Sequence, residues 1–551
     1  MTLSLQKISG EFFKGWLLHY LVILASAALV YSQIVSFEFT NWDDDKNISK
    51  NPCLQKLTVE NVKSILSPGA MPGEQLYIPF TYLSYLMEST VFGMKSSVMH
   101  FDNLLLHLIN AFLVYSLAFL LFKNRTASLI CALLFTLHPL QVEAVAWAMG
   151  RKDLLMTMFS LLCLLKFSDF INTKSKKSYM FSLILFFAAV FSKPSAFVLP
   201  VILPVLNWYF NGKTDKAFLL RILPFFVMSV VACLINSKLD MNNFGHELKF
   251  VMFRVVFIPA VAEDWLSRLF LLQNPEAYYS WYDYYDGSCI TVGGLILIVS
   301  ILVVTAYAFY RKLKTIFLGM SFLIVMSIPA SLLVSWSFRD FITADRYGYF
   351  PLIGVFLIAG SVILISTSRI YRAVSLCAIS FFIIISAWRS CHQAEIWKNS
   401  ETLWKSVEKS HPDSYFAHYN LGNYYFKSKY DLKASEYHYR KANSITPDSD
   451  AWFNTGIMCE LTNRKDESVV CYARAVALNP ESPYALKKYA LACYGKGELE
   501  TALRCFLRLT ELTPDSPEVY FYCGKIFDIK GQKEMAAEAF ALYEKLKKQS
   551  K

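Results

Sequence analysis

The chain changes character near residue 389, where long apolar runs give way to mixed polar and apolar positions. An uninterrupted apolar run of about 20 residues predicts a membrane-spanning helix, since that length of helix crosses the hydrocarbon core of a bilayer. Such runs lie near 16–36, 103–122, 126–138, 153–171, 178–193, 195–210, 217–235, 290–310, 315–335, 351–367 and 373–388. They predict a multi-spanning membrane domain over 1–389 with about eleven transmembrane helices.

Lysine and arginine fall in alternate loops between these runs. The basic loops contain Lys123 and Arg125, Lys174 to Lys177, Lys213 and Lys216, Arg311 to Lys314, and Arg369 and Arg372. The positive-inside rule places this set in the cytoplasm. The N-terminus is then cytoplasmic and the part after residue 389 is extracytoplasmic, provided that residues 247–273 do not cross the membrane. We expect a lateral or re-entrant helix there, because Glu263, Asp264 and Arg268 interrupt the apolar pattern.

Beyond residue 411 small residues recur at a fixed interval. Gly422, Gly456, Ala490 and Gly524 are 34 residues apart, which is the period of the tetratricopeptide (TPR) repeat. Small-then-aromatic pairs such as Ala502 with Phe506 agree with the same repeat, in which small residues let paired helices approach closely. The pattern predicts about four repeats over 413–551 and a connecting half repeat over 390–412. The fold class is therefore all-α, a polytopic membrane domain followed by a TPR α-solenoid.

A TPR array offers a concave binding surface rather than a catalytic centre. Asn423, Tyr424 and Asn454 are our candidates for lining such a groove and binding a peptide or protein. The alternative is that the array serves only as a rigid stalk.

Composition excludes some function classes. Apolar residues make up 55% of the chain and the mean hydropathy is +0.36, too high for an ordinary soluble enzyme. The net charge of +11 lies mostly in short loops, so we expect no nucleic-acid partner. The twelve cysteines show no CxxC and no Cys/His ligand spacing, so the sequence predicts no zinc site.

Acidic and basic residues gather in loops assigned to the outer side. The first outer loop, 37–102, opens with the acidic run Asp43, Asp44 and Asp45. Further clusters are His138, Glu143, Arg151, Lys152 and Asp153; Lys193; and Arg339, Asp340, Asp345, Arg346 and Tyr347. Charged residues at membrane depth are costly and usually mark a functional site. Their common side favours a reaction in which a carboxylate acts as base and cations bind a phosphate.

The chain resembles the transmembrane and tetratricopeptide-repeat-containing O-mannosyltransferases and their bacterial relatives. The resemblance rests on NWDDDKNISKNP, HFDNLLLHLINA, HPLQVEAVAWAMGRKDLL, SKPSAFVLP, ADRYGYFPLIG and ETLWKSVEKSHPDSYFAHYNLGNYY, which occur in family order across nearly the whole chain. It implies a membrane domain of the GT-C glycosyltransferase type. It also implies transfer of mannose, with inversion, from a polyprenyl-phosphate carrier to Ser/Thr hydroxyls. The carrier-linked sugar is then the donor substrate, and no cofactor is expected.

Carried over residue by residue, the resemblance gives candidate roles. It places the catalytic pair on Asp43 and Asp44, together with Glu143. We assign binding of the donor phosphate to His138, Arg151, Lys193 and Arg346 on the grounds of charge and side. The repeat array is shorter than in the animal enzymes, so we expect a bacterial relative in an inner membrane with a periplasmic array. A divalent ion at Asp43 and Asp44 is neither required nor excluded.

Two other functions remain open from the sequence. The chain can be a non-catalytic, membrane-anchored TPR scaffold for envelope proteins. A transporter is the third hypothesis, although it calls for polar residues near the membrane midplane, whereas most of these lie at helix ends.

Overall fold

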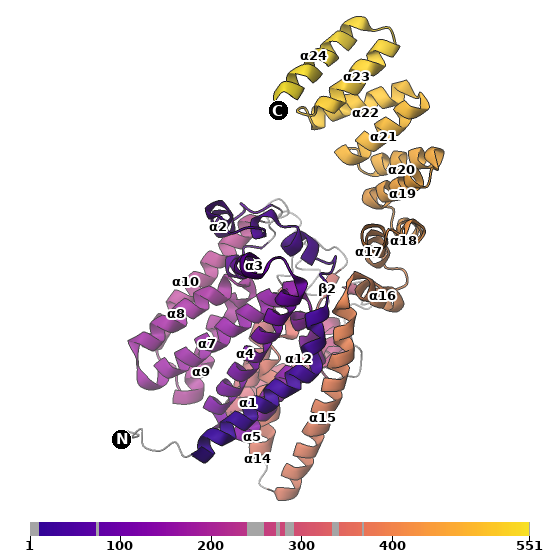
Figure 1. Cartoon of the computed structure of the whole chain (residues 1–551). Helices are drawn as coiled ribbons and strands as arrows, with labels where there is room; N and C mark the ends of the chain where they lie inside the picture. The colour runs from indigo at the N-terminus through magenta and orange to yellow at the C-terminus, as the bar shows by residue number, and fades with distance from the viewer. Residues whose placement is uncertain are drawn as a thin grey trace. The chain divides into compact units, whose positions relative to one another are not determined.

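Almost every element of the computed structural model is a helix. The structure describes residues 10–72, 76–239, 258–270, 276–280, 291–332, 341–365 and 368–549. The chain divides into two compact units, Met1–Leu403 and Trp404–Lys551. The predicted fold class, a helical membrane domain followed by a TPR solenoid, is confirmed (Figure 1).

The first unit is a bundle of long and short helices (Figure 1). Its helices are α1 (Gly10–Tyr31), α2 (Val59–Leu66), α3 (Pro79–Phe92), α4 (Ser96–Phe122), α5 (Arg125–Leu137), α6 (Val142–Ala146), α7 (Arg151–Thr173), α8 (Lys176–Val190), α9 (Ile202–Asn211), α10 (Lys216–Leu239), α12 (Val292–Tyr310), α13 (Lys314–Leu332), α14 (Ile353–Ile365) and α15 (Arg369–Glu395). Helix α4 packs on α5 and α7, while α5 also contacts α1, α14 and α15. These contacts bury the centre of the bundle and leave apolar side chains of α10, α12 and α15 exposed, as lipid-facing helices require.

Fewer helices qualify as membrane spans than the sequence predicts. Among the described residues, six are long and apolar enough to cross a bilayer, or seven if the bent pair Arg125–Leu137 and Pro139–Ala146 is one span. The predicted count of eleven is therefore not confirmed. The difference arises because several runs form shorter helices, such as α8 with 15 residues and α9 with 10. The chain is an integral membrane protein.

Three basic loops form tight turns of the same design. The lysine that follows α4, α7 and α12 has a left-handed backbone, with φ of 53° at Lys123, 60° at Lys174 and 56° at Lys312. After the first two, Asn124 and Ser175 cap the next helix by accepting a hydrogen bond from a backbone N–H. The helices they join are therefore adjacent, antiparallel neighbours.

A sharply bent segment joins the C-terminal end of α5 to the N-terminal end of α7. Helix α5 ends at Leu137, and the next segment, Pro139–Ala146, is bent from it by 59°. A short turn, Ala148–Gly150, then starts α7. A Cβ on Gly150 would lie only 2.2 Å from the carbonyl oxygen of Ala144, so only glycine allows this close approach. The turn fixes where Arg151, Lys152 and Asp153 begin their helix.

The segment 247–273 is described only in part. Residues 258–269 form a helix, which is not among those long enough to span, and the rest of the stretch lies outside the described residues. Arg339 and Asp340 also lie outside them. Strand β1 (Tyr279–Ser280) pairs antiparallel with β2 (Phe341–Thr343), a small addition to the all-α fold.

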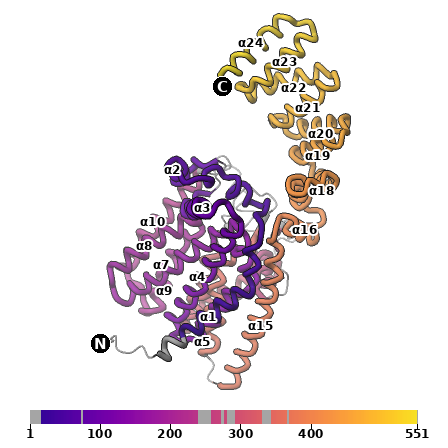
Figure 2. The backbone as a smooth tube through the Cα atoms, viewed as in Figure 1, coloured from indigo at the N-terminus to yellow at the C-terminus, as the bar shows by residue number. Residues whose placement is uncertain are grey.

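The second unit consists of α16 (Ser400–Ser410), which begins just before it, and four helix pairs stacked in chain order (Figure 2). The pairs are α17 (Tyr415–Tyr424) with α18 (Leu432–Ile445), α19 (Ser449–Leu461) with α20 (Lys465–Leu478), α21 (Pro483–Lys496) with α22 (Leu499–Leu512), and α23 (Pro517–Ile529) with α24 (Lys533–Gln549). The first helices begin at residues 415, 449, 483 and 517, so the predicted 34-residue period is confirmed.

The predicted close approach at the small residues is also present. A Cβ on Gly422 would lie 2.7 Å from the ring of Tyr439, and one on Gly456 would lie 2.5 Å from the ring of Tyr472. Gly524 faces Phe540 in the same manner. Each glycine therefore admits an aromatic ring from the second helix of its own repeat.

Candidate functional site

The loop that follows α1 is bonded to the segment between α15 and α16 and to the start of α16. The backbone N–H of Glu38 donates to the carbonyl of Lys398 at 2.9 Å, and that of Asn41 donates to the hydroxyl of Ser400 at 2.9 Å. Ring contacts of Trp42 with Tyr278 and Trp397 hold the loop further. The acidic run thus lies at the end of the membrane domain from which the chain continues into the repeats.

Asp44 is a structural residue of this loop. Its side chain is fully buried, and one carboxylate oxygen accepts hydrogen bonds from the backbone N–H and the hydroxyl of Thr40, both at 2.9 Å. The other oxygen accepts from the backbone N–H of Met149 at 3.1 Å. Burial raises the pKa of Asp44 to about 7, although these hydrogen bonds lower it. Asp44 therefore joins the first outer loop to the turn before α7.

Asp43 differs from its neighbour in having a half-buried carboxylate that accepts no hydrogen bond from the described residues. Burial raises its pKa, while the positive charges of Lys152, Arg346 and Lys46 lower it. A carboxylate with free lone pairs next to cations is the arrangement of a general base. Of the three aspartates, Asp43 alone combines partial burial with free acceptor capacity, since Asp45 pairs with Lys50 at 3.3 Å.

Glu143 and Arg346 form a buried ion pair across the site. One carboxylate oxygen of Glu143 bonds to a guanidinium nitrogen of Arg346, and the other accepts from the Arg346 backbone N–H at 2.8 Å. The guanidinium also lies over the rings of Trp147, at 4.9 Å, and Tyr347, at 5.0 Å. Both oxygens of Glu143 are thus engaged, so its geometry supports positioning of Arg346 rather than proton transfer.

Two further lysines, Lys152 and Lys193, lie in the region of Trp147 and Tyr347. The ammonium of Lys152 lies 5.0 Å from the centre of the Trp147 ring, and Lys152 makes no hydrogen bond or ion pair with the described residues. Lys193 pairs with Asp153 and lies 5.4 Å from the centre of the Tyr347 ring. The sequence placed Lys152 in the charged cluster but gave it no role. Only the structure shows that Lys152 has no hydrogen-bond or ion-pair partner among the described residues.

Arg151 is a buried strut and not an accessible cation. Its side chain is 1% exposed and bonds to Glu88, to Asn103 Oδ1 at 3.0 Å and to the carbonyl of Met99 at 2.8 Å. The guanidinium also stacks on Tyr85, at 4.4 Å. These contacts join α3, α4 and α7 and hold the buried guanidinium between protein acceptors. We therefore leave Arg151 out of the proposed site, contrary to the expectation from charge alone.

His138 is likewise structural in its geometry. It is fully buried at the bend after α5, where its Nδ1 accepts from the backbone N–H of Leu140 at 3.2 Å. Its Nε2 must then donate to the carbonyl of Leu269 at 2.9 Å. His138 thus joins the bend to helix 258–269, and neither nitrogen is available to a donor phosphate.

Helix 258–269 carries another buried ion pair next to this region. Arg268 is fully buried, bonds to Asp264 and donates to Asp345 Oδ1 at 2.6 Å. The hydroxyl of Tyr279 donates to the same oxygen at 2.9 Å. Burial raises the pKa of Asp345 to about 7, while Arg268 lowers it. The network sets the position of Asp345, the residue directly before Arg346.

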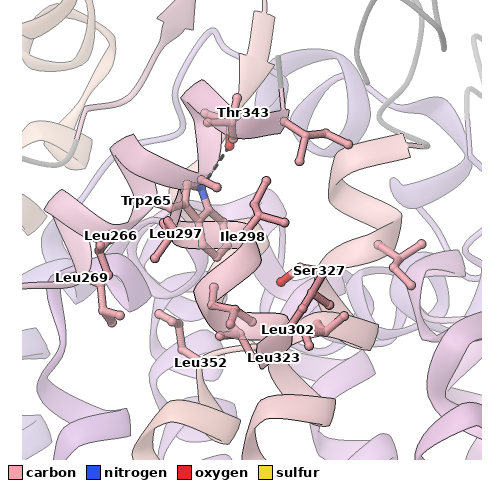
Figure 3. A pocket seen from close by; sticks show the side chains of 16 residues that line it. Trp265, Leu266, Leu269, Leu297, Ile298, Leu302, Leu323, Ser327, Thr343 and Leu352 are labelled. Carbon is pink, nitrogen blue, oxygen red and sulfur yellow. Dashed lines mark hydrogen bonds between the residues drawn. The ribbon is translucent and has the colours of Figure 1, made fainter. Parts of the chain in front are cut away.

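An apolar cavity of about 350 Å³ opens beside this network (Figure 3). Its walls come from helix 258–269, α12 and α13, with Thr343 and Leu352 at the ends of neighbouring segments. Trp265 reaches across one end and donates from Nε1 to the hydroxyl of Thr343 at 3.2 Å (Figure 3). Thr343, at the polar end of the cavity, is only three residues before Arg346 in the sequence. The cavity can accept an aliphatic chain.

The three groove candidates of the repeats have different environments. Asn423 and Asn454 are half-exposed, and Asn423 accepts from the hydroxyl of Tyr439 at 2.9 Å. Tyr424 is buried, so its ring fills the first repeat instead of lining an open surface. The two asparagines remain available to a peptide.

Comparison with known proteins finds similarity to the family that the sequence motifs resemble. Residues 80–238 match the family model described as dolichyl-phosphate-mannose-protein mannosyltransferase. Human protein O-mannosyl-transferase TMTC1 is 25% identical over 427 residues, which cover 67% of this chain and 48% of that protein. Mouse protein O-mannosyl-transferase TMTC3 is 24% identical over 541 residues, covering 84% of this chain and 56% of that protein.

The chain therefore spans about half the length of the curated relatives it matches. A solved structure, the crystal structure of MamA, matches 27% of this chain and 88% of its own length at 20% identity, with a TM-score of 0.26. The resemblance to the O-mannosyltransferase family, drawn above from short motifs, is confirmed over most of the chain.

Proposed function

We propose that this protein is an integral-membrane glycosyltransferase. It transfers a sugar, mannose by its family resemblance, from a polyprenyl-phosphate carrier to Ser/Thr hydroxyls of a protein on the non-cytoplasmic side of the membrane. The observation that carries the proposal is Asp43, whose carboxylate accepts no hydrogen bond from the described residues and faces the positive charges of Lys152 and Arg346. This arrangement supports a base next to an anion-binding site.

The reaction needs one proton transfer and one displacement. Asp43 accepts the proton of the acceptor hydroxyl while its oxygen attacks the anomeric carbon of the sugar. The bond from that carbon to the phosphate oxygen breaks, and the polyprenyl phosphate leaves with both electrons of the bond. A single displacement inverts the anomeric configuration. No metal is needed to balance the step.

The cations bind the phosphate that leaves. Lys152 is the first candidate because, among the described residues, it has no acidic partner to displace. Arg346 is held by Glu143 and Lys193 by Asp153, so each approaches the phosphate already partly neutralised. Charge developing on the leaving phosphate is stabilised best by such preorganised donors. The apolar cavity beside Thr343 accommodates part of the polyprenyl chain.

The repeat array supplies the acceptor protein. The segment 398–400, which is bonded to the acidic loop, leads directly into α16 and the first repeat. An array that starts at this end of the membrane domain is on the side of Asp43, and Asn423 and Asn454 offer amides to an extended peptide. With the N-terminus cytoplasmic, this side is extracytoplasmic, and in a bacterial inner membrane it is the periplasm.

The three adjacent aspartates provide a matched test. We expect Asp43→Asn to lower sugar transfer by about 10²–10⁴-fold, the usual contribution of a general base. Asp45→Asn is the control, since among the described residues the carboxylate of Asp45 pairs with exposed Lys50, and we expect its loss to leave transfer unchanged. The measurement is mass spectrometry of envelope O-glycopeptides from a deletion strain that carries each variant at equal membrane abundance. Normal glycopeptides with Asp43→Asn would refute the catalytic role.

The pH dependence adds a second readout. Burial raises the pKa of Asp43, so more of it is protonated near neutral pH than of a free aspartate. Only the ionised form accepts a proton, and the transfer rate of membrane vesicles should therefore rise as the pH increases through this pKa.

The scaffold hypothesis predicts instead that even the deletion strain keeps its O-glycopeptide profile.

A further inference from the structure

The start of the repeat array brings together three side chains that can ligate a metal. Glu408 lies on α16, His418 on α17 and His438 on α18. Each offers one ligand atom, and the three atoms all lie within 4.8 Å of one another. The spacing of 10 and 20 residues matches no common metal-binding pattern, which is why the sequence predicts no metal site here. The packing of α16, α17 and α18 brings the three side chains together.

The hydrogen bonds of His418 define its tautomer. Its Nε2 lies 2.9 Å from the carbonyl oxygen of Pro412, which can only accept, so Nε2 carries the proton. In the neutral ring, Nδ1 then presents a lone pair to the other two residues. A histidine that ligates a metal through one ring nitrogen usually donates a hydrogen bond from the other nitrogen, often to a backbone carbonyl, and this bond fixes the ring.

Three atoms that can ligate a metal face one another as a result. The Nδ1 of His418 is 3.0 Å from Nδ1 of His438 and 3.6 Å from Oε1 of Glu408. His438 Nδ1 is 4.0 Å from the same carboxylate oxygen. A proton on His438 can satisfy one of these approaches, but it leaves the carboxylate facing the lone pair of His418. A cation at the centre satisfies all three.

The separations agree with a tetrahedral zinc ion. Two ligands at about 2.0–2.1 Å from Zn²⁺ and at the tetrahedral angle are about 3.3 Å apart. The observed separations of 3.0, 3.6 and 4.0 Å lie around this value. The longest joins His438 to the carboxylate of Glu408, a side chain that is 31% exposed.

The surroundings hold the rings and admit an ion. The ring of Tyr425 stacks on His438 at 5.4 Å and 11°, and Tyr437 meets its edge at 5.0 Å. Burial lowers the pKa of His438 to about 4, with smaller effects of His418 and Lys405, so the ring is neutral as a ligand must be. Lys405 opposes cation binding and Glu408 favours it. The exposed carboxylate gives the ion a path from solvent.

We infer that Glu408, His418 and His438 bind one Zn²⁺ ion, with a fourth coordination position left to water or to a group of a bound protein. The site connects α16 to the first repeat through a metal, so it stiffens the start of the array. Two imidazoles and one carboxylate are a common ligand set for zinc with an open position. The inference does not depend on the transferase activity.

The test uses the full chain, purified in detergent with a tag free of histidine and stripped with a chelator. Zinc added to the wild type should bind at one ion per chain by calorimetry and elemental analysis. Glu408→Gln and His438→Gln should weaken binding by more than about tenfold, the least that losing even an outer-shell partner costs. The controls are Glu481→Gln and His392→Gln, which alter exposed residues away from the group.

Two outcomes would overturn the inference. A wild type that binds no more zinc than Glu408→Gln would show that the histidines share a proton only. Binding that survives in both variants would place the metal elsewhere. Glu408→Gln is the decisive variant because it changes a partly exposed side chain and should fold normally. As a second readout, amide hydrogen exchange across residues 404–445 should slow when zinc is added to the wild type and not to this variant.

Discussion

Replacing Asp44 with asparagine separates a structural from a chemical role within the acidic run. The buried carboxylate accepts from the backbone N–H and hydroxyl of Thr40 and from the backbone N–H of Met149. The amide of asparagine has one acceptor oxygen, so whichever way it turns, one buried N–H loses its partner. An orphaned buried donor costs about 1–3 kcal/mol. The contact between the first outer loop and the start of α7 should weaken by that amount.

Amide hydrogen exchange measures this contact directly. A loss of about 1–3 kcal/mol corresponds to roughly 5- to 150-fold faster opening, and the effect should appear at residues 37–54 and 147–150. Asp45→Asn is again the control and should leave exchange unchanged. Unaltered exchange in Asp44→Asn, combined with loss of sugar transfer, would refute the reasoning and assign the chemistry to Asp44.

The same loop should respond to pH. Burial raises the pKa of Asp44 to about 7, above the value of about 3.9 for a free aspartate. The folded loop therefore binds this proton more tightly than the open one, and its protection falls as the pH rises from about 4 to about 7. Asp44→Asn removes the titrating group and should flatten this dependence.

Other sites give further predictions. Arg151→Met leaves Glu88 as a buried, unpaired charge and should destabilise the membrane domain by about 3–5 kcal/mol, read as a lower thermal midpoint in detergent. Gly456→Ala should cost about 1–3 kcal/mol, because the added Cβ would lie 2.5 Å from the ring of Tyr472, and denaturant unfolding of the array measures it. Trp265→Ala removes the residue that spans one end of the apolar cavity, and we expect a raised KM for the polyprenyl donor with little change in kcat.

The sequence predicts the parts of the molecule that depend on short-range periodicity. The 34-residue interval gives the start of every helix pair in the array, because each repeat buries its small and aromatic residues against its own partner helix. The apolar runs likewise identify the membrane helices, but they do not fix how many of these helices span the bilayer. Helices α8 and α9 form from two of these runs, but with 15 and 10 residues they are shorter than a membrane span requires.

The roles of charged residues depend on contacts that no local pattern contains. Asp43 and Asp44 are neighbours in the chain, yet only Asp44 is held by a residue about a hundred positions away. The sequence makes Arg151 a candidate phosphate ligand, but in the structure its guanidinium pairs with Glu88 of α3. Hydropathy and charge indicate which side of the membrane the residues occupy. They do not indicate which charges are already neutralised.

The even spacing of the repeat starts at residues 415, 449, 483 and 517 has an evolutionary consequence. Since each repeat contacts only its neighbours, a duplication or deletion of 34 residues preserves every interface and changes only the reach of the array. Array length can therefore vary between lineages by simple gene rearrangement while the membrane-embedded chemistry stays constant. A change in copy number is then a simpler route to a longer or shorter array than a change of any single side chain.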